Sequence, residues 1–269
     1  MRLLRLIATF TPILALVPLI AAAQTPRYEQ IEVANGGAVR GRVTFEGAPP
    51  AFKLKVTQDL TVCHHEDGLT SSTRLSVGPE GGVAEAVVFL RDVARGKPLA
   101  ELEAPLKLDQ VGCAYKPFVQ VAPFLSSLEI VNSDRLNHNV NGKTDDGMQV
   151  FNYAMPNPNW PEKQSIARPM RRAGLLTIQC DIHNWMSAYV WVVRHPYYAV
   201  TDAKGAFELK DVPPGEYELV AWHPGWKVEP RTTALGQPAG YDYGAPVEKS
   251  VKVTVAPGGA ATVDFVINK

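Results

Sequence analysis

Short segments in which apolar and polar residues alternate recur along most of this chain. Alternation with a period of two places the apolar side chains on one face of a β-strand. Turns that contain glycine or proline, such as Glu80-Gly81-Gly82 and Pro213-Pro214-Gly215, separate the segments. The predicted strands lie at residues 39–45, 83–90, 128–132, 175–180, 188–193, 206–209, 217–222, 251–255 and 262–267.

The number and spacing of these strands predict the fold class. The chain has 22 prolines and 21 glycines, and no convincing amphipathic helix follows its first 23 residues. We therefore predict an all-β protein built from β-sandwiches. Residues 141–172 are rich in proline, asparagine and charge, and we interpret them as a loop that the sheets carry.

The first residues have the order of a secretory signal peptide. Arg2 and Arg5 precede an apolar run at residues 6–20, which ends in small residues at 21–23. Residues 1–23 are therefore predicted to be cleaved, and the mature protein is expected in the periplasm or secreted. The apolar run is shorter than the ~20 residues of a membrane span, so we expect no span after cleavage. An uncleaved anchor is the alternative.

Charge and motifs exclude several classes of function. Lysine plus arginine and aspartate plus glutamate number 27 each. This balance and the lack of a basic stripe argue against binding to nucleic acid. The sequence also lacks a phosphate-binding glycine loop and a dinucleotide fingerprint.

Three cysteines constrain an exported chain. One disulfide leaves one thiol over, and a free thiol in an oxidising compartment needs protection by burial, by an intermolecular bridge or by a metal. Cys180 lies in Cys-Asp-Ile-His-Asn-Trp-Met, among other metal-binding residue types, whereas Cys63 and Cys113 lack such a segment. We predict a Cys63–Cys113 disulfide and a metal on Cys180.

The ligand types around Cys180 favour copper. An ion that cycles between Cu+ and Cu2+ is held well by two imidazoles, a thiolate and a weak axial thioether. Cys180, His183 and Met186 would share the turn between two predicted strands, and His138 would lie in a loop just beyond strand 128–132. One mononuclear copper on these four residues is the prediction. Zinc is the alternative, although Met186 is a poor zinc ligand.

The spacing Cys-x-x-His-x-x-Met resembles the cupredoxins, and most of all the amicyanin-type blue copper proteins of methylamine-oxidising bacteria, over about residues 106–194. The resemblance implies a Greek-key sandwich with His138, Cys180, His183 and Met186 as ligands. It also implies that Asn139 ties the two ligand loops together. Two departures are the absence of proline beside His183 and a long segment between His138 and Cys180.

A second resemblance covers the end of the chain. Residues 198–209, 212–219 and 262–267 are similar to the carboxypeptidase regulatory-like domain, a non-catalytic transthyretin-like sandwich, and its usual opening strand is similar to residues 41–49. The implied organisation is a signal peptide at 1–23, a β segment at 24–104, a copper domain at 105–195 and this sandwich at 196–269. Segment 24–104 is either the first half of that sandwich or a separate subdomain.

These features lead to two kinds of functional hypothesis. The first is an electron carrier, not an enzyme, in which His183 meets a redox protein partner through an apolar surface formed by Ile182 and Trp185. The chain has six histidines, too few for the clustered sites of copper oxidases. The alternatives are a copper-binding or delivery module, or a cell-surface sandwich without a redox role.

Overall fold

The computed structural model describes residues 28–63, 69–71, 74–99, 105–159, 164–236 and 238–268. The predicted signal peptide lies outside this range. The described residues are mainly β-strands, with one short helix, α1 (Leu60–Cys63), and one 3-10 turn, η1 (Pro79–Gly81). The predicted all-β class with two sandwiches is confirmed. Among the described residues, no helix has the length and apolar character to cross a membrane.

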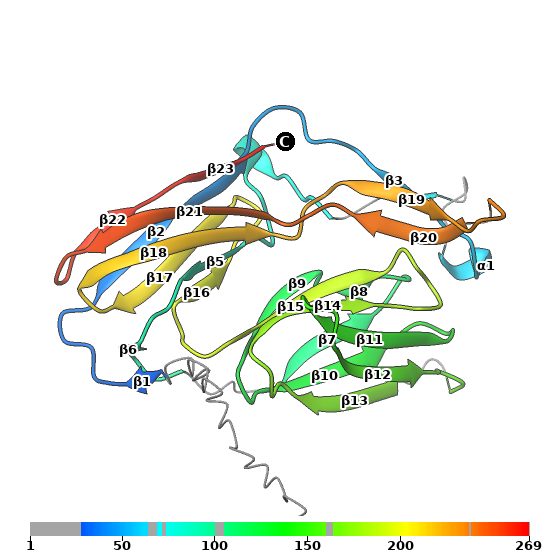
Figure 1. Ribbon diagram of the computed structural model, residues 1–269, viewed down its shortest axis with the longest axis horizontal. Helices are drawn as coiled ribbons and strands as arrows, with labels where there is room; N and C mark the ends of the chain where they lie inside the picture. The colour runs from blue at the N-terminus through cyan, green and yellow to red at the C-terminus, as the bar shows by residue number, and fades with distance from the viewer. Residues whose placement is uncertain are drawn as a thin grey trace, which may run out of the picture.

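One sandwich, here called the terminal sandwich, is built from both ends of the chain (Figure 1). Its first sheet contains β17 (Ala206–Val212), β2 (Gly37–Phe45), β22 (Ala260–Thr262) and β23 (Phe265–Ile267). Its second sheet has the order β16 (Tyr198–Val200), β5 (Val87–Leu90), β18 (Gly215–His223) and β21 (Val247–Val255). Strands β2 and β5 therefore pair with strands more than a hundred residues later in the chain.

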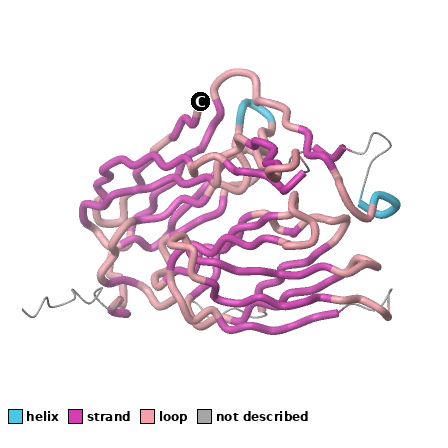
Figure 2. Tube along the Cα trace, turned by 45° about the vertical axis from the view of Figure 1, so that its right-hand side comes forward, coloured by secondary structure: helices cyan, strands magenta, loops and turns pink. Residues whose placement is uncertain are grey.

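The middle sandwich lies between these two parts of the chain (Figures 1 and 2). Its larger sheet has the order β12 (Gln149–Met155), β11 (His138–Thr144), β14 (Gly174–Gln179), β15 (Ser187–Val193) and β9 (Val119–Pro123). The smaller sheet has the order β13 (Gln164–Pro169), β10 (Ser127–Asn132), β7 (Leu106–Gln110) and β8 (Tyr115–Lys116). Fully buried Leu108, Ile130 and Ile178 belong to the core between the sheets.

The predicted loop at 141–172 is wrong. Strands β11, β12 and β13 fill much of this region, and β11 pairs with both β12 and β14. The polar side chains of Asn139, Asn141 and Asn152 all hydrogen-bond to the Asp181 carboxylate. Because these bonds satisfy the side-chain Nδ2–H groups of the asparagines, β11 and β12 form without the apolar alternation that marks other strands.

Smaller elements extend from the terminal sandwich over the middle one (Figure 1). The remaining pairs are β1 (Glu29–Gln30) with β6 (Arg95–Gly96), β3 (Lys53–Lys55) with β4 (Leu69–Ser71), and β19 (Val228–Thr232) with β20 (Pro238–Tyr243). Leu54 and Val56 join the core of the middle sandwich, and the Tyr243 hydroxyl donates to the carbonyl of Asn184 at 3.3 Å. The segments around β3 and β20 therefore cover the end of the middle sandwich that carries the Cys180 loop.

Arg74 joins the two sandwiches. Its guanidinium is buried, donates to Ser187 Oγ at 2.8 Å and Tyr189 Oη at 2.7 Å, and also donates to the carbonyl of Pro224. Its carbon Cζ lies 4.0 Å from the centre of the Tyr243 ring. The arginine thus connects strand β15 to Pro224, which follows β18, and to Tyr243 at the end of β20.

Candidate metal centre

The segment from Cys180 to Met186 forms the turn between β14 and β15. The Cys180 N–H donates to the Met186 carbonyl at 3.3 Å, and the Met186 N–H donates to the His183 carbonyl at 2.9 Å. The His183 N–H points to Cys180 Sγ at 3.3 Å. The turn therefore wraps around the thiol, as the sequence predicted for a hairpin loop.

His138 reaches the same point from β11. It is the first residue of that strand, so the prediction that it lies in a loop is wrong, because pairing with Met155 on β12 begins at this residue. Its Nδ1 lies 2.8 Å from Nδ1 of His183, which lies 3.8 Å from Cys180 Sγ. One ligand atom from each of His138, Cys180 and His183 lies within 4.8 Å of the others.

All four predicted ligands are buried. His183 has an exposed fraction of 0%, His138 of 1%, and Cys180 and Met186 of 2% each. Met186 belongs to the core of the middle sandwich and closes the turn that begins at Cys180. The site is therefore shielded from water.

Each imidazole has a carboxylate on its other nitrogen, which the sequence analysis missed. Nε2 of His138 lies 2.9 Å from Asp134 Oδ2, and Nε2 of His183 lies 2.8 Å from Asp59 Oδ2. Asp134 also accepts bonds from the N–H groups of Gly112 and Cys113 at 2.7 and 2.9 Å. No local signal marks Asp59, since it lies 124 residues before His183.

Electrostatics favour charged forms in this buried cluster. Burial alone would raise the pKa of the Cys180 thiol, but hydrogen bonds with His138, His183 and backbone N–H groups lower this pKa to about 6. Burial would lower the pKa of His138, but its bonds to Asp134 and Cys180 raise it. The pKa of Asp134 is lowered, because bonds from His138 and two backbone N–H groups outweigh burial.

The donor set fits a metal cation. When both imidazoles are neutral and both Nε2–H groups donate to carboxylates, both Nδ1 atoms carry lone pairs, and these face each other at 2.8 Å beside a thiol that ionises readily. Facing lone pairs repel unless a proton or a metal ion lies between them. Two imidazole nitrogens, a thiolate and a thioether are the ligands typical of a blue-copper site, and Met186 offers a thioether from the same turn as Cys180 and His183.

Asn139 connects β11 to the Cys180 turn. Its Oδ1 accepts from the Asp181 N–H at 2.5 Å, and its Nδ2 donates to Asp181 Oδ2 at 2.7 Å. Its carbonyl accepts from the Tyr115 hydroxyl at 2.6 Å. The side chain therefore ties the Cys180 turn to strand β11, whereas the resemblance implied a tie between two loops.

Cys63 and Cys113 form a disulfide whose Cα atoms lie 5.3 Å apart, and Cys180 is free and buried. Cys113, Asp134 and His138 also form a compact group. The Cys113 sulfur is already bonded in the disulfide, so this second group offers no thiolate to a metal.

The predicted apolar surface at Ile182 and Trp185 is wrong. Trp185 is 6% exposed, its Nε1 donates to the carbonyl of Cys113 at 3.3 Å, and its ring centre lies 5.1 Å from that of His183. Ile182 is half-buried against the core. The Asp59 carboxylate contacts Nε2 of His183 at 2.8 Å, so this ring edge is covered by the segment that carries Asp59 and α1.

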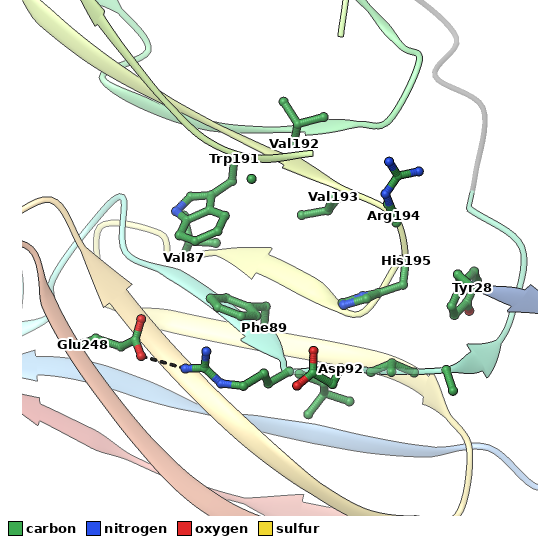
Figure 3. A pocket seen from close by; sticks show the side chains of 15 residues that line it. Tyr28, Val87, Phe89, Asp92, Trp191, Val192, Val193, Arg194, His195 and Glu248 are labelled. Atoms are coloured by element: carbon green, nitrogen blue, oxygen red, sulfur yellow. Dashed lines mark hydrogen bonds and ion pairs between the residues drawn. The ribbon is translucent and has the colours of Figure 1, made fainter. Parts of the chain in front are cut away.

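A separate pocket of about 560 Å³ lies between the two sandwiches (Figure 3). Phe89 and Trp191 line it, with ring centres 5.3 Å apart, while Asp92 lies at its lower edge and His195 toward its right side in this view. Gly174, at the opposite end of β14 from Cys180, also lines it. None of the predicted ligands is among its lining residues.

Comparison with known proteins gives partial matches. A family model described as BOS complex subunit NOMO1-like, second beta sandwich domain, matches residues 195–237. This match agrees with a β-sandwich in that part of the chain. Comparison with curated proteins gives no match.

Several solved copper proteins are similar to part of the chain. Amicyanin from Paracoccus versutus is 20% identical over 36% of this chain and 92% of that protein, with a TM-score of 0.29. A copper-containing nitrite reductase from Thermus scotoductus is 22% identical over 37% of this chain and 24% of its own, with a TM-score of 0.28. A purple cupredoxin from Nitrosopumilus maritimus is 17% identical over 33% of this chain and 99% of its own, with a TM-score of 0.27. At these TM-scores the matches do not indicate a shared function.

Proposed function

We propose that this protein binds one copper ion through His138, Cys180, His183 and Met186 and carries electrons for a redox protein outside the cytoplasm. The observation that supports this proposal is the convergence of the two Nδ1 atoms and the Cys180 thiol in a buried cluster. The carboxylates on both Nε2 atoms orient the two rings toward the same point.

Copper, when bound, supplies a one-electron couple between Cu+ and Cu2+. The protein residues supply a rigid environment for it. Hydrogen bonds within the Cys180 turn and between Asn139 and Asp181 hold the ligands in place. A site that does not rearrange when its charge changes favours electron transfer.

Burial supports a carrier over a catalyst. A substrate would need to reach a ligand position, yet His138, Cys180 and His183 are at most 2% exposed. An electron can pass through packed protein, whereas a substrate cannot. We therefore propose no reaction on a bound substrate.

A second candidate is a copper-binding protein that retains its metal without rapid electron exchange. The contact between Asp59 and His183 favours this second candidate. The Asp59 carboxylate lies 2.8 Å from Nε2 of His183 and so covers the ring edge through which a redox partner would exchange electrons. Reversible reduction by a small-molecule reductant, monitored by visible absorbance, separates the two candidates. Copper that cycles supports the carrier, and copper that binds but does not cycle supports retention.

The test is the visible spectrum of the purified protein after addition of cupric ion. We expect an intense thiolate-to-copper band that is absent in Cys180→Ser, because the serine hydroxyl cannot replace the thiolate donor. Cys63 and Cys113 are bonded to each other and remain intact in this variant. A colourless wild-type protein, or equal copper uptake by both proteins, contradicts the proposal.

A further inference from the structure

Asp59 reaches the metal centre from outside the middle sandwich. It lies directly before α1, in the segment that crosses from the terminal sandwich. The His183 side chain is 0% exposed, whereas that of Asp59 is 47% exposed, and their Nε2 and Oδ2 atoms lie 2.8 Å apart. Asp59 therefore forms the outer wall of the centre on this side.

The segment from Asp59 to Cys63, here called the latch segment, is held in shape by hydrogen bonds within its own turn and is fixed to the middle sandwich by a disulfide. The N–H groups of Val62 and Cys63 each donate to the Asp59 carbonyl at 2.9 Å. Cys63 is bonded to Cys113, whose N–H donates to Asp134. The disulfide thus joins the segment that carries one carboxylate to the loop that holds the other.

We infer that Asp59 is a positioning residue of the metal centre and that the Cys63–Cys113 disulfide keeps it on His183. This inference rests on the proposed copper binding. An Nε2–H of His183 that donates to Asp59 leaves Nδ1 unprotonated and directed toward His138 and Cys180. The latch segment thereby fixes the ring and slows the loss of metal.

The first test is Asp59→Asn in the copper-loaded full chain. Asparagine keeps the size of the side chain and tolerates the left-handed backbone, with φ 49, that Asp59 adopts. Because loss of such a partner weakens metal binding about 10–100-fold, we expect copper transfer to a chelator to accelerate by about that factor. Asp92→Asn is the matched control, since Asp92 has φ 52 and is exposed, and it should leave the rate unchanged.

A second measurement needs no metal. Nitrogen NMR of copper-free protein should show His183 protonated at Nε2, and Asp59→Asn should raise the share protonated at Nδ1. An unchanged tautomer and an unchanged chelator rate together overturn the inference. Wild-type protein that binds no copper overturns the proposed function instead, and the tautomer result then still decides the role of Asp59.

The contribution of the disulfide to metal retention is tested with two variants. The first combines Cys63→Ala with Cys113→Ala, and the second adds Asp59→Asn to these two changes. If the disulfide acts through Asp59, the combined variant loses copper no faster than Asp59→Asn alone, because changes that remove one shared contact are not additive. If the effects on the rate of copper loss add up in the combined variant, the disulfide does not act through Asp59, and this part of the inference is overturned. Asp59→Asn keeps the disulfide, so the positioning role is tested even where the cysteine variants do not fold.

Discussion

The Cys180 thiol lies in surroundings that act on its pKa in opposite directions. Burial raises the pKa of this thiol, because it disfavours the charged thiolate. Hydrogen bonds with His138, His183 and nearby backbone N–H groups lower the pKa by more than burial raises it. A thiol of this kind binds metal near neutral pH, because little work is needed to remove its proton. As pH falls, protons compete with metal for the same sulfur, so copper affinity should fall with it.

The first residue-scale prediction is the titration of Cys180 in copper-free protein. Its thiolate should appear with a midpoint about pH 6, since its pKa is lowered from the ordinary 9.0 to about 6. Ultraviolet thiolate absorbance measures the midpoint, with Cys180→Ser as the baseline because it removes the titrating group and leaves the disulfide. A midpoint near the ordinary value would show that the imidazoles do not hold the thiolate.

Sequence patterns predict β-strands well where one face of the strand is apolar. They predict strands poorly where polar side chains on neighbouring strands hydrogen-bond to one another. The turn from Cys180 to Met186 lies between β14 and β15 as predicted, because apolar alternation marks both strands. Strands β11 and β12 were missed, since asparagines bonded to Asp181 replace that alternation. Asp59 was missed because only the folded chain brings it beside His183.

Asn139 tests the link between β11 and the Cys180 turn. Asn139→Ala removes the bonds to the N–H and carboxylate of Asp181, and each lost bond of this kind costs about 1–3 kcal/mol. We expect a lower free energy of unfolding in denaturant and faster release of copper to a chelator. Asn268→Ala, at an exposed position near the chain end, serves as the control. Equal stability of the two variants would mean that Asn139 does not connect these elements.

At the scale of the whole molecule, the two sandwiches share a buried contact. Val87 and Trp222 of the terminal sandwich pack with Val119 and Tyr189 of the middle one, beside Arg74. The terminal sandwich itself forms from strands on both sides of the middle one in the chain. We therefore expect the two sandwiches to unfold together.

Arg74→Met tests this coupling. Methionine fills much of the space but donates no hydrogen bond, so Ser187, Tyr189 and the Pro224 carbonyl lose a charged donor. Hydrogen bonds to charged groups contribute about 1.5–3 kcal/mol, and we expect a loss of at least that size in unfolding free energy. Arg40→Met, at an exposed position on β2, is the control. Calorimetry that shows no change in Tm for Arg74→Met would contradict the coupling.

The disulfide also limits how the molecule can move. Main chain connects the two sandwiches between β6 and β7 and again between β15 and β16, and the Cys63–Cys113 bridge, with a sequence separation of 50, joins the segment that carries Asp59 to the loop between β7 and β8. While the bridge is intact, we expect the segment that carries Asp59 to stay beside His183 even when the two sandwiches move relative to each other. A redox partner would therefore meet a preassembled surface, and electrons would have to cross protein that stays in place.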